Sequence, residues 1–519
     1  MVRLQELAEQ SANGVYSNQQ RSALDNEAQA LSEEYIRIAR STEFNGQKLF
    51  TGDTPVVNLQ AGVGTDAVLS TSVGGAIGTG SFQSAATYFE AGAVINSDIA
   101  DVNYDGYLDI VYSTLTTSNV ALGSADGTFS DSELAFALGI VETTVLDDFN
   151  ADGNIDILAT NNTEIIFAAG NGDGTFESPV TSSATWSIED VTTGDFNGDG
   201  IIDIATTSQS NSRFTIQTGN GDGTFTETDV EIMASAEGAS VGDFNGDGYD
   251  DLVVASAAQA AIYLSNGDGT LGTVRYAGGV NGSEDTAVGD LDGDGNLDIV
   301  LSEDNNTIEA LYGNGDGTFE TQVVLSASIS GEISIVDFNG DGENDLVIGD
   351  NSVSVLLGEG GREFGSEASY ALDVSGFLST SMIVADINDD GVLDISQASA
   401  TSGLQYIEQS TVAGISPLLE FSLETQSDAK LALPYFQREL ERLSEQRGQI
   451  GSYMARINVA ENVLSVTVEN YTSAESRIRD ADIAQEAADL ARLNILQQAG
   501  AAVLSQANSQ PQLALSLLT

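Results

Sequence analysis

The stretch Asp195–Asp203, which reads DFNGDGIID, decides the fold, because the chain contains seven variants of it. The copies follow one another at spacings of 47, 47, 48, 47, 47 and 49 residues and begin at Asp101, Asp148, Asp195, Asp243, Asp290, Asp337 and Asp386. A fixed period of this length indicates one repeated supersecondary unit, and about 40–50 residues suit a four-stranded propeller blade. The sequence therefore predicts seven blades.

Each copy carries oxygen side chains at positions 1, 3, 5 and 9 and a glycine at position 6. This spacing turns several oxygens toward one centre, and glycine permits the left-handed backbone of such a turn. Oxygen ligands without thiolate or imidazole favour Ca²⁺, so we predict up to seven calcium ions, with the carbonyl of position 7 completing each set. The candidate ligands are Asp101, Asn103, Asp105, Asp109, Asp148, Asn150, Asp152, Asp156, Asp195, Asn197, Asp199, Asp203, Asp243, Asn245, Asp247, Asp251, Asp290, Asp292, Asp294, Asp298, Asp337, Asn339, Asp341, Asp345, Asp386, Asn388, Asp390 and Asp394.

Two other interpretations of the repeat are an EF-hand and a metal-free turn. An EF-hand needs an acidic ligand at position 12 and flanking helices, whereas position 12 is never acidic here and a short β-type run such as Asp298–Leu301 follows each loop. Asp, Asn and Gly also dominate turns that bind nothing. Seven identical four-oxygen spacings favour calcium in a strand-to-strand loop over turn preference alone.

A second motif, GNGDGTF, alternates with the first. Its aspartates Asp173, Asp222 and Asp316 fit a Gly/Asn-rich turn better than a metal site. The motif is absent after Asp394, but residues 78–82 (GTGSF) look like a worn copy. We expect this stretch to supply the missing strand from the other side of the ring, which removes the last exposed sheet edge. The ends of the propeller then lie together, as insertion into a host domain requires.

The composition excludes several functions. The chain has 519 residues with 16 basic and 79 acidic side chains, giving a net charge of −63. Nucleic acid and anionic membranes are implausible partners for such a field. With no Cys and no His, the chain has no disulfide, catalytic triad or imidazole base, and we predict that it is not an enzyme. Seven calcium ions would reduce the net charge to −49.

The two ends differ from the acidic middle, because only three of the 16 basic residues lie between Lys48 and Lys430. Apolar spacing predicts helices over residues 1–42, broken at Asn13-Gly14, and a hairpin over 49–77. A heptad-like seam predicts a long helix over 428–472, and a second helix over 473–508 carries two apolar stripes that imply neighbours on more than one side. No run is long enough to span a membrane, and the first residues lack the apolar core of a secretory signal peptide.

The middle of the chain, about residues 78–412, resembles the FG-GAP/VCBS repeats of integrin α-like propellers, and the resemblance implies calcium in the loops. The ends are similar to bacterial flagellin over about 1–62 and 425–519. The matching segments are RLQELAEQSAN at 3–13, TEFNGQKL at 42–49, AESRIRDAD at 474–482 and ILQQAG at 495–500.

These resemblances imply a multidomain α + all-β chain in which flagellin-type helical coiled-coil ends carry an inserted seven-bladed propeller, with domains over 1–77, 78–412 and 413–519. They imply an extracellular subunit of the bacterial flagellar filament that associates with other flagellin subunits and is exported without a cleaved signal peptide. The alternative is an adhesin, a carbohydrate- or protein-binding module presented on a flagellin scaffold. Flagellins begin with helix upstream of the segment matching Arg3, so we expect a truncated chain, a misassigned start, or a chain that cannot polymerise normally.

Overall fold

The computed structural model describes the chain in two compact units. The first comprises Met1–Val56 and Ser72–Gln446, and the second comprises Val57–Thr71 and Arg447–Thr519. Within these ranges the structure describes all residues except 53–55, 61–67, 73, 84–85, 90–93, 115–116, 126, 131–132, 137–140, 142, 233–235, 257–258, 279–282, 304, 327, 350–351, 372–380, 400–402 and 517–519.

Three helices are described. They are α1 (Val2–Ser11), α2 (Asn18–Ser41) and α3 (Gln426–Ser516), and α1 and α2 confirm the predicted helix with its break at Asn13-Gly14. The side-chain oxygen of Gln20 accepts a hydrogen bond from the backbone N–H of Ser17 at 3.0 Å, which caps the start of α2. None of the helices in the described residues is long and apolar enough to cross a membrane.

The helical part of the first unit has its own core. Leu4 and Leu7 of α1 and Ala28 of α2 pack with Ala432 and Phe436, which lie in the first turns of α3. All five side chains are at most 3 % exposed. Apolar residues at three- and four-residue spacing therefore bring the two ends of the sequence into one small bundle.

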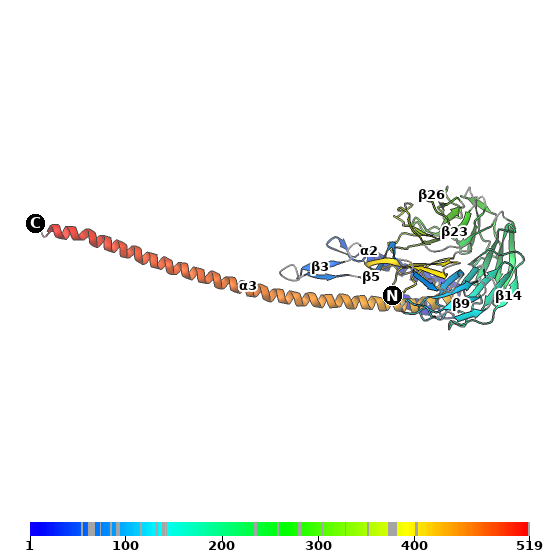
Figure 1. Cartoon of the computed structure of the whole chain (residues 1–519), viewed down its shortest axis with the longest axis horizontal. Coiled ribbons are helices and arrows are strands. Elements are labelled where there is room, and N and C mark those ends of the chain that lie inside the picture. The colour runs from blue at the N-terminus through cyan, green and yellow to red at the C-terminus, as the bar shows by residue number, and fades with distance from the viewer. Residues whose placement is uncertain are drawn as a thin grey trace. The chain divides into compact units, whose positions relative to one another are not determined.

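α3 corrects one prediction from the sequence. We expected two helices that meet near residue 473, but α3 is one helix of 91 residues (Figure 1). The segment around 471–474 (YTSA) contains neither Gly nor Pro, so nothing interrupts the i to i−4 hydrogen bonds there. The apolar pattern that changes near residue 473 therefore does not mark a helix boundary. It marks a change in which side of one continuous helix carries the apolar residues.

Two small hairpins follow α2. β1 (Glu43–Phe44) pairs with β2 (Gln47–Lys48) around Asn45-Gly46, both of which have positive φ. In the second unit, β3 (Val57–Gln60) pairs with β4 (Val68–Thr71), which confirms the hairpin predicted over 49–77.

Seven four-stranded antiparallel sheets form the propeller (Figure 1). Numbered along the chain, the blades are: blade 1, β7 (Val94–Ala100), β8 (Asp109–Thr114), β9 (Ser118–Ala121) and β10 (Glu133–Phe136); blade 2, β11 (Thr143–Asp147), β12 (Asp156–Asn161), β13 (Glu164–Ala168) and β14 (Val180–Ser183); blade 3, β15 (Asp190–Gly194), β16 (Asp203–Ser208), β17 (Arg213–Gly219) and β18 (Phe225–Ile232); blade 4, β19 (Ala239–Gly242), β20 (Asp251–Val254), β21 (Ala260–Tyr263) and β22 (Arg275–Ala277); blade 5, β23 (Ser283–Gly289), β24 (Asp298–Glu303), β25 (Thr307–Leu311) and β26 (Val323–Ser326); blade 6, β27 (Glu332–Val336), β28 (Asp345–Gly349), β29 (Ser352–Leu356) and β30 (Ala368–Ala371); blade 7, β31 (Met382–Ala385), β32 (Asp394–Ser399), β33 (Gly403–Ile407) and β6 (Ala86–Phe89).

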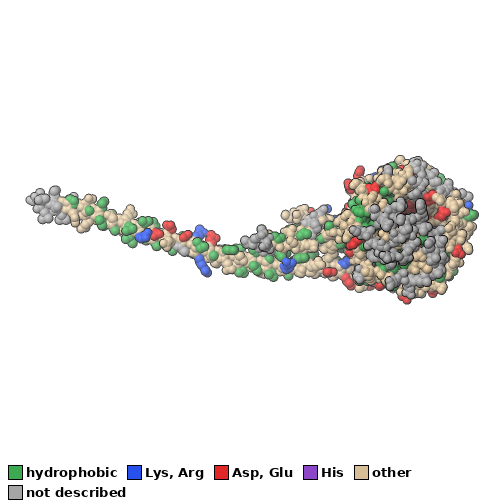
Figure 2. All heavy atoms as spheres, in the orientation of Figure 1, with side chains coloured by type: hydrophobic (Ala, Val, Ile, Leu, Met, Phe, Trp, Pro, Cys, Tyr) green, Lys and Arg blue, Asp and Glu red, His purple; other side chains and the backbone are tan. Residues whose placement is uncertain are grey.

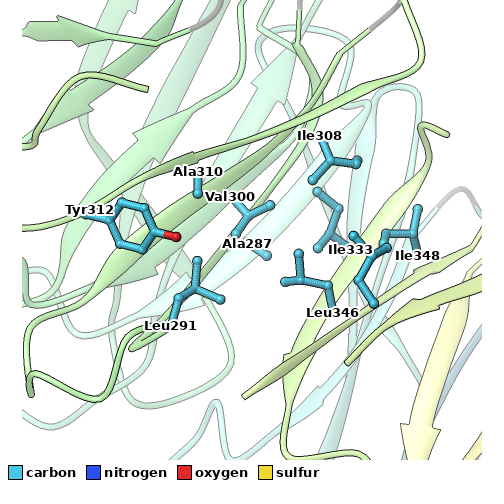
Figure 3. Packing of buried hydrophobic residues seen from close by; sticks show 10 residues of the cluster. Ala287, Leu291, Val300, Ile308, Ala310, Tyr312, Ile333, Leu346 and Ile348 are labelled. Carbon is cyan, nitrogen blue, oxygen red and sulfur yellow. The ribbon is translucent and has the colours of Figure 1, made fainter. Parts of the chain in front are cut away.

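The propeller core consists of apolar layers between neighbouring blades. Each of the seven pairs of adjacent blades, including blades 7 and 1, shares one cluster of buried side chains. Figure 3 shows the layer between blades 5 and 6, where Val300 and Ile308 of blade 5 face Ile333 and Leu346 of blade 6. Because both faces of a blade are covered, strands such as β24 are buried at every position instead of at alternate ones.

Polar side chains also join the innermost strands. Asp98 of β7 accepts the backbone N–H of Leu146 at 2.9 Å, and Glu332 of β27 accepts that of Met382 at 2.8 Å. Ser97 and Ser381 join blades 1 and 7 at 3.0 Å. The described blades thus form a closed ring.

The ring closes from the N-terminal side, although not with the strand that we predicted. The fourth strand of blade 7 is β6, which pairs with β33. The stretch 78–82 belongs instead to β5 (Gly75–Phe82), which pairs with β34 (Gln409–Gly414). Phe82 lies opposite Gln409, just as Phe129 lies opposite Gly123 in the second motif of blade 1, so 78–82 is a split copy of that motif and the strand that follows it closes the blade.

Candidate metal centre

All seven repeat loops occupy the same place in their blades. Position 1 directly follows the innermost strand, and position 9 is the first residue of the second strand, as with Asp195 after β15 and Asp203 at the start of β16. The loops therefore lie at one end of every blade, as the strand-to-strand prediction requires. We number them loop 1 (from Asp101) to loop 7 (from Asp386).

The aspartate at position 1 folds the loop around itself. In loop 3, one oxygen of Asp195 accepts the N–H of Gly198 at 2.7 Å, and the other accepts that of Gly200 at 2.8 Å. The bond from the position 6 N–H to position 1 recurs in all seven loops at 2.7–2.8 Å. Position 6 has φ between 79° and 93° throughout, which favours glycine.

The aspartate at position 9 joins the loop to the second motif. In loop 3, Asp203 accepts the N–H of Phe196 at 3.1 Å with one oxygen and that of Gly219 at 2.8 Å with the other. The second bond recurs in every blade at 2.7–2.9 Å, and in blade 7 Gln409 donates it. The position 9 aspartates are at most 1 % exposed.

The position 9 carboxylates lie in an environment that disfavours their charge. Burial first, and neighbouring loop carboxylates second, raise the pKa of Asp109, Asp156, Asp203 and Asp345 to about 7. Burial raises the pKa of Asp394 to about 8. A bound cation would offset these like charges, and the donor set offers oxygen ligands for one.

Two further observations test whether the residues fit a calcium ion. In loop 5, one oxygen of each of Asp290, Asp292 and Asp294 lies within 4.8 Å of the others. In loop 6, Oδ1 of Asp337 is buried and has no hydrogen-bond partner among the described residues. Converging carboxylates and an unsatisfied buried oxygen match a hard divalent cation, so the residues fit Ca²⁺.

Sequence reasoning missed one feature of the loops. Position 4 also adopts a left-handed backbone in all seven, although it is Tyr104, Ala151 and Asp389 in loops 1, 2 and 7. The glycine at this position in the other four loops was the signal. In the second motif Asp173 accepts the N–H of Thr175 at 3.1 Å and is exposed, an arrangement that a Gly/Asn-rich turn also gives.

Comparisons with known proteins agree with both parts of the chain. Residues 1–54 match the bacterial flagellin N-terminal helical region, and residues 434–518 match the bacterial flagellin C-terminal helical region. Five overlapping FG-GAP-like repeats match between residues 148 and 395. The two ends of the chain therefore match the terminal regions of bacterial flagellin, and the FG-GAP-like repeats between them lie within the seven-bladed propeller.

Curated relatives match a small part of the chain. The chain is 47 % identical over 79 residues to a flagellin of Bacillus subtilis, which covers 15 % of this chain and 26 % of that protein. It is 42 % identical over 90 residues to a flagellin of Clostridium tyrobutyricum, covering 17 % and 24 %. The chain thus spans about a quarter of the length of these relatives.

Solved structures similar to the chain include two lectins. A lectin from Burkholderia pseudomallei has a TM-score of 0.47 at 12 % identity, covering 63 % of this chain and 99 % of that one. A lectin from Agrocybe aegerita has a TM-score of 0.44 at 22 % identity, covering 55 % and 82 %. Both scores are below 0.5, so neither likeness supports a statement about the ligand of this propeller.

Proposed function

We propose that the chain is a structural subunit of the bacterial flagellar filament and displays a calcium-binding propeller on the filament surface. The observation that carries the proposal is the pair of flagellin regions at the two ends, whose helices share one core. Flagellins form the extracellular filament, which gives this chain an extracellular location reached without a cleaved signal peptide. A surface ligand for the propeller stays a prediction.

The exposed apolar side chains of α3 support self-association. From Ile450 onward the helix carries large apolar side chains that are 36–68 % exposed (Figure 2). They are Ile450, Met454, Ile457, Val459, Val463, Val466, Val468, Tyr471, Ile478, Ile483, Leu490, Leu493, Ile495, Leu496, Val503 and Leu504. An apolar surface of this length marks an association site, and other flagellin subunits are the partners that we propose for it.

The proposed calcium ions stabilise the propeller. Position 1, 3, 5 and 9 side chains and the position 7 carbonyl would hold each ion, up to seven in all, as the site geometry favours. A bound cation offsets the like charges that are buried at each loop. In this proposal calcium acts structurally, by fixing loops that join the first two strands of every blade.

Assembly tests the filament proposal. The purified chain is concentrated under conditions that polymerise flagellins, sedimented and viewed by electron microscopy, alone and with a flagellin that forms filaments. We expect the chain to enter the pellet and the filaments. Ile495→Asp should strongly reduce the amount of chain in the pellet and in the filaments, because it places a charge among the exposed apolar side chains. Gln485→Asp on the same helix should leave that amount unchanged. A chain that remains in the supernatant in both mixtures contradicts the proposal.

A further inference from the structure

Helix side chains lie directly on five of the seven loops. An ideal Cβ built on the position 6 glycines would approach Lys430 in loop 2, Pro434 in loop 1 and Arg442 in loop 7, all on α3. It would approach α2 in the other two, at Asn18 in loop 3 and Arg40 in loop 6. Glycine at position 6 therefore serves the close approach of the helices as well as the loop backbone.

The contacts on α3 come from one face of the helix. Lys430, Pro434, Arg438 and Arg442 are spaced by four residues, which aligns them along the axis. Lys430 donates its Nζ to the carbonyl of Gly153, and the Arg438 guanidinium lies 5.1 Å from the centre of the Tyr107 ring in loop 1. α3 thus crosses loops 2, 1 and 7 in that order.

Basic side chains reach candidate ligand carboxylates in three loops. Arg442 Nη2 lies 3.5 Å from Oδ2 of Asp386 in loop 7, and Arg40 Nη2 lies 3.7 Å from Oδ2 of Asp337 in loop 6. In loop 5 the basic residue comes from blade 6, where Arg362 Nε lies 2.8 Å from Oδ2 of Asp292. That carboxylate stands at position 3, where the other loops have asparagine, so Arg362 offsets a charge found only in loop 5.

Loops 3 and 4 differ from these three. Among the described residues, no Lys or Arg forms an ion pair with their candidate ligands. In loop 4 nothing lies within 4 Å of a Cβ built on Gly248. Loop 3 has only the neutral contact from Asn18, whose Nδ2 donates to the carbonyl of Asp199 at 3.4 Å.

We propose that these contacts divide the loops into two classes of calcium site. Loops 3 and 4 bind calcium tightly, and the other five bind it more weakly, because a basic side chain lies against each of them. In loops 5, 6 and 7 an arginine already neutralises a ligand carboxylate. In loops 2 and 1 the positive charges of Lys430 and Arg438 lie on the loop. In loops 6 and 7 the competing arginines belong to α2 and α3, so calcium at these loops and docking of the helices on the propeller oppose each other. This inference rests on the proposed calcium binding.

Linkage makes the opposition reciprocal. If Arg442 lowers the calcium affinity of loop 7 by some factor, calcium in loop 7 weakens the contact of Arg442 by the same factor. Calcium then stabilises the loop of each blade and at the same time weakens the contacts of α2 and α3 with the propeller. The helices are therefore coupled to the metal.

The test is calorimetric titration of Ca²⁺ into the chelator-stripped full chain. We expect two tight sites followed by weaker ones. Asp247→Asn in loop 4 should remove a tight site, and Asp390→Asn in loop 7 a weak one. Arg442→Gln should tighten one weak site by about 5- to 100-fold, the usual range of such coupling. Arg362→Gln should do the same for loop 5 and leaves the helix contacts intact.

Arg447→Gln is the matched control, because Arg447 is exposed on the same helix. It should leave every site unchanged. A single class of sites in the wild type, or an unchanged or weakened affinity in both Arg442→Gln and Arg362→Gln, overturns the two-class proposal while leaving calcium binding intact. Absence of binding heat in the wild type and all variants overturns the calcium proposal itself, so the two failures are distinguishable.

Discussion

At the scale of single residues, the position 9 aspartates determine how the loops are held. Each is buried and accepts a backbone N–H from the second motif, so the two repeat motifs of a blade are one hydrogen-bonded unit. This explains why the motifs alternate along the chain, a regularity that the sequence displays without giving its cause.

Asp203→Asn tests this unit. Both Asp203 oxygens accept backbone N–H groups, and asparagine offers only one oxygen, so one buried donor loses its partner. We expect a loss of about 1–3 kcal/mol in the free energy of unfolding, measured by urea denaturation in EDTA. The matched control is Asp222→Asn in the exposed second motif, which should change stability by less than about 0.5 kcal/mol. Equal effects of the two substitutions contradict the role of Asp203.

Half-buried carboxylates of the innermost strands predict a pH dependence. Burial raises the pKa of Asp98 from 3.8 to about 6 and raises that of Glu332 well above 4.5, and nearby Asp285 adds to the shift at Glu332. A carboxyl whose pKa is higher in the folded state stabilises fully below its unfolded pKa, and the stabilisation is lost as pH rises through the folded value. The stability that Asp98 contributes to the ring therefore falls as the pH rises from about 4 to about 6 and stays lost above that. The contribution of Glu332 falls from about pH 4.5 upward.

Glu332→Gln isolates the second of these contributions. Glutamine keeps an oxygen that accepts the N–H of Met382 and carries no charge. The stability of the Glu332→Gln variant should therefore fall less with rising pH than that of the wild type. The difference should grow by up to about 1.4 kcal/mol per pH unit above pH 4.5. Thermal melts from pH 4.5 to pH 8 measure it, with exposed Glu227→Gln as control. Parallel curves for wild type and Glu332→Gln would refute the assignment.

At the scale of elements, β5 and β6 complete the ring. Phe82 of β5 packs its ring 5.4 Å from Phe338 and 4.3 Å from Tyr370, both of blade 6. This contact holds the end of β5, the strand that precedes β6 in the chain, against blade 6.

Phe82→Ala should therefore weaken closure. We expect a loss of about 2–3 kcal/mol, below the value for a fully buried phenylalanine because Phe82 is half-buried. Hydrogen exchange measured by mass spectrometry should show the loss of protection first in β6 and β33. Phe44→Ala, at a side chain that is 70 % exposed, should leave exchange unchanged. Uniform loss of protection around the ring would contradict a local role for Phe82.

How much of each element could be predicted depends on the range of the forces that form it. The loops and blades follow from spacing within about fifty residues and were predicted. The closing strand depends on pairing between 86–89 and 403–407, which no local pattern encodes, and the weak motif at 78–82 pointed only to its neighbourhood. No local pattern in the sequence predicts that α3 continues past residue 473. The same is true of the contacts of Arg40 and Arg442 with the loops.

At the scale of the whole molecule, the excess of negative charge works against folding. A net charge of −63 opposes compaction, and seven calcium ions would reduce it to −49 while also filling the loops. From the sequence alone, we expect chelation to affect the propeller and to leave the terminal helices largely unchanged. That expectation stays a prediction, and the proposed opposition between calcium and the contacts of α2 and α3 on the loops predicts instead that the helices respond to chelation.

Removing calcium should lower the melting temperature of the propeller. Each site contributes about 2.7 kcal/mol when free calcium is a hundred times its dissociation constant. Calorimetry in calcium and in EDTA measures the shift, and 0.5 M NaCl should recover part of it by screening the acidic surface. Salt in the presence of calcium is the control, and it should have a smaller effect. Identical melts in calcium and EDTA would show that the loops need no metal.

The split origin of blade 7 also has a consequence in time. Its outer strand, β6, is made before the other six blades, and its remaining three strands are made after them. A polypeptide delivered gradually, from a ribosome or through a narrow passage, can stack the first six blades as they arrive, but its earliest strand must wait more than three hundred residues for a partner. The ring then closes in a single late event, when β33 becomes available to pair with β6. Every shorter portion of the chain exposes two unpaired sheet edges.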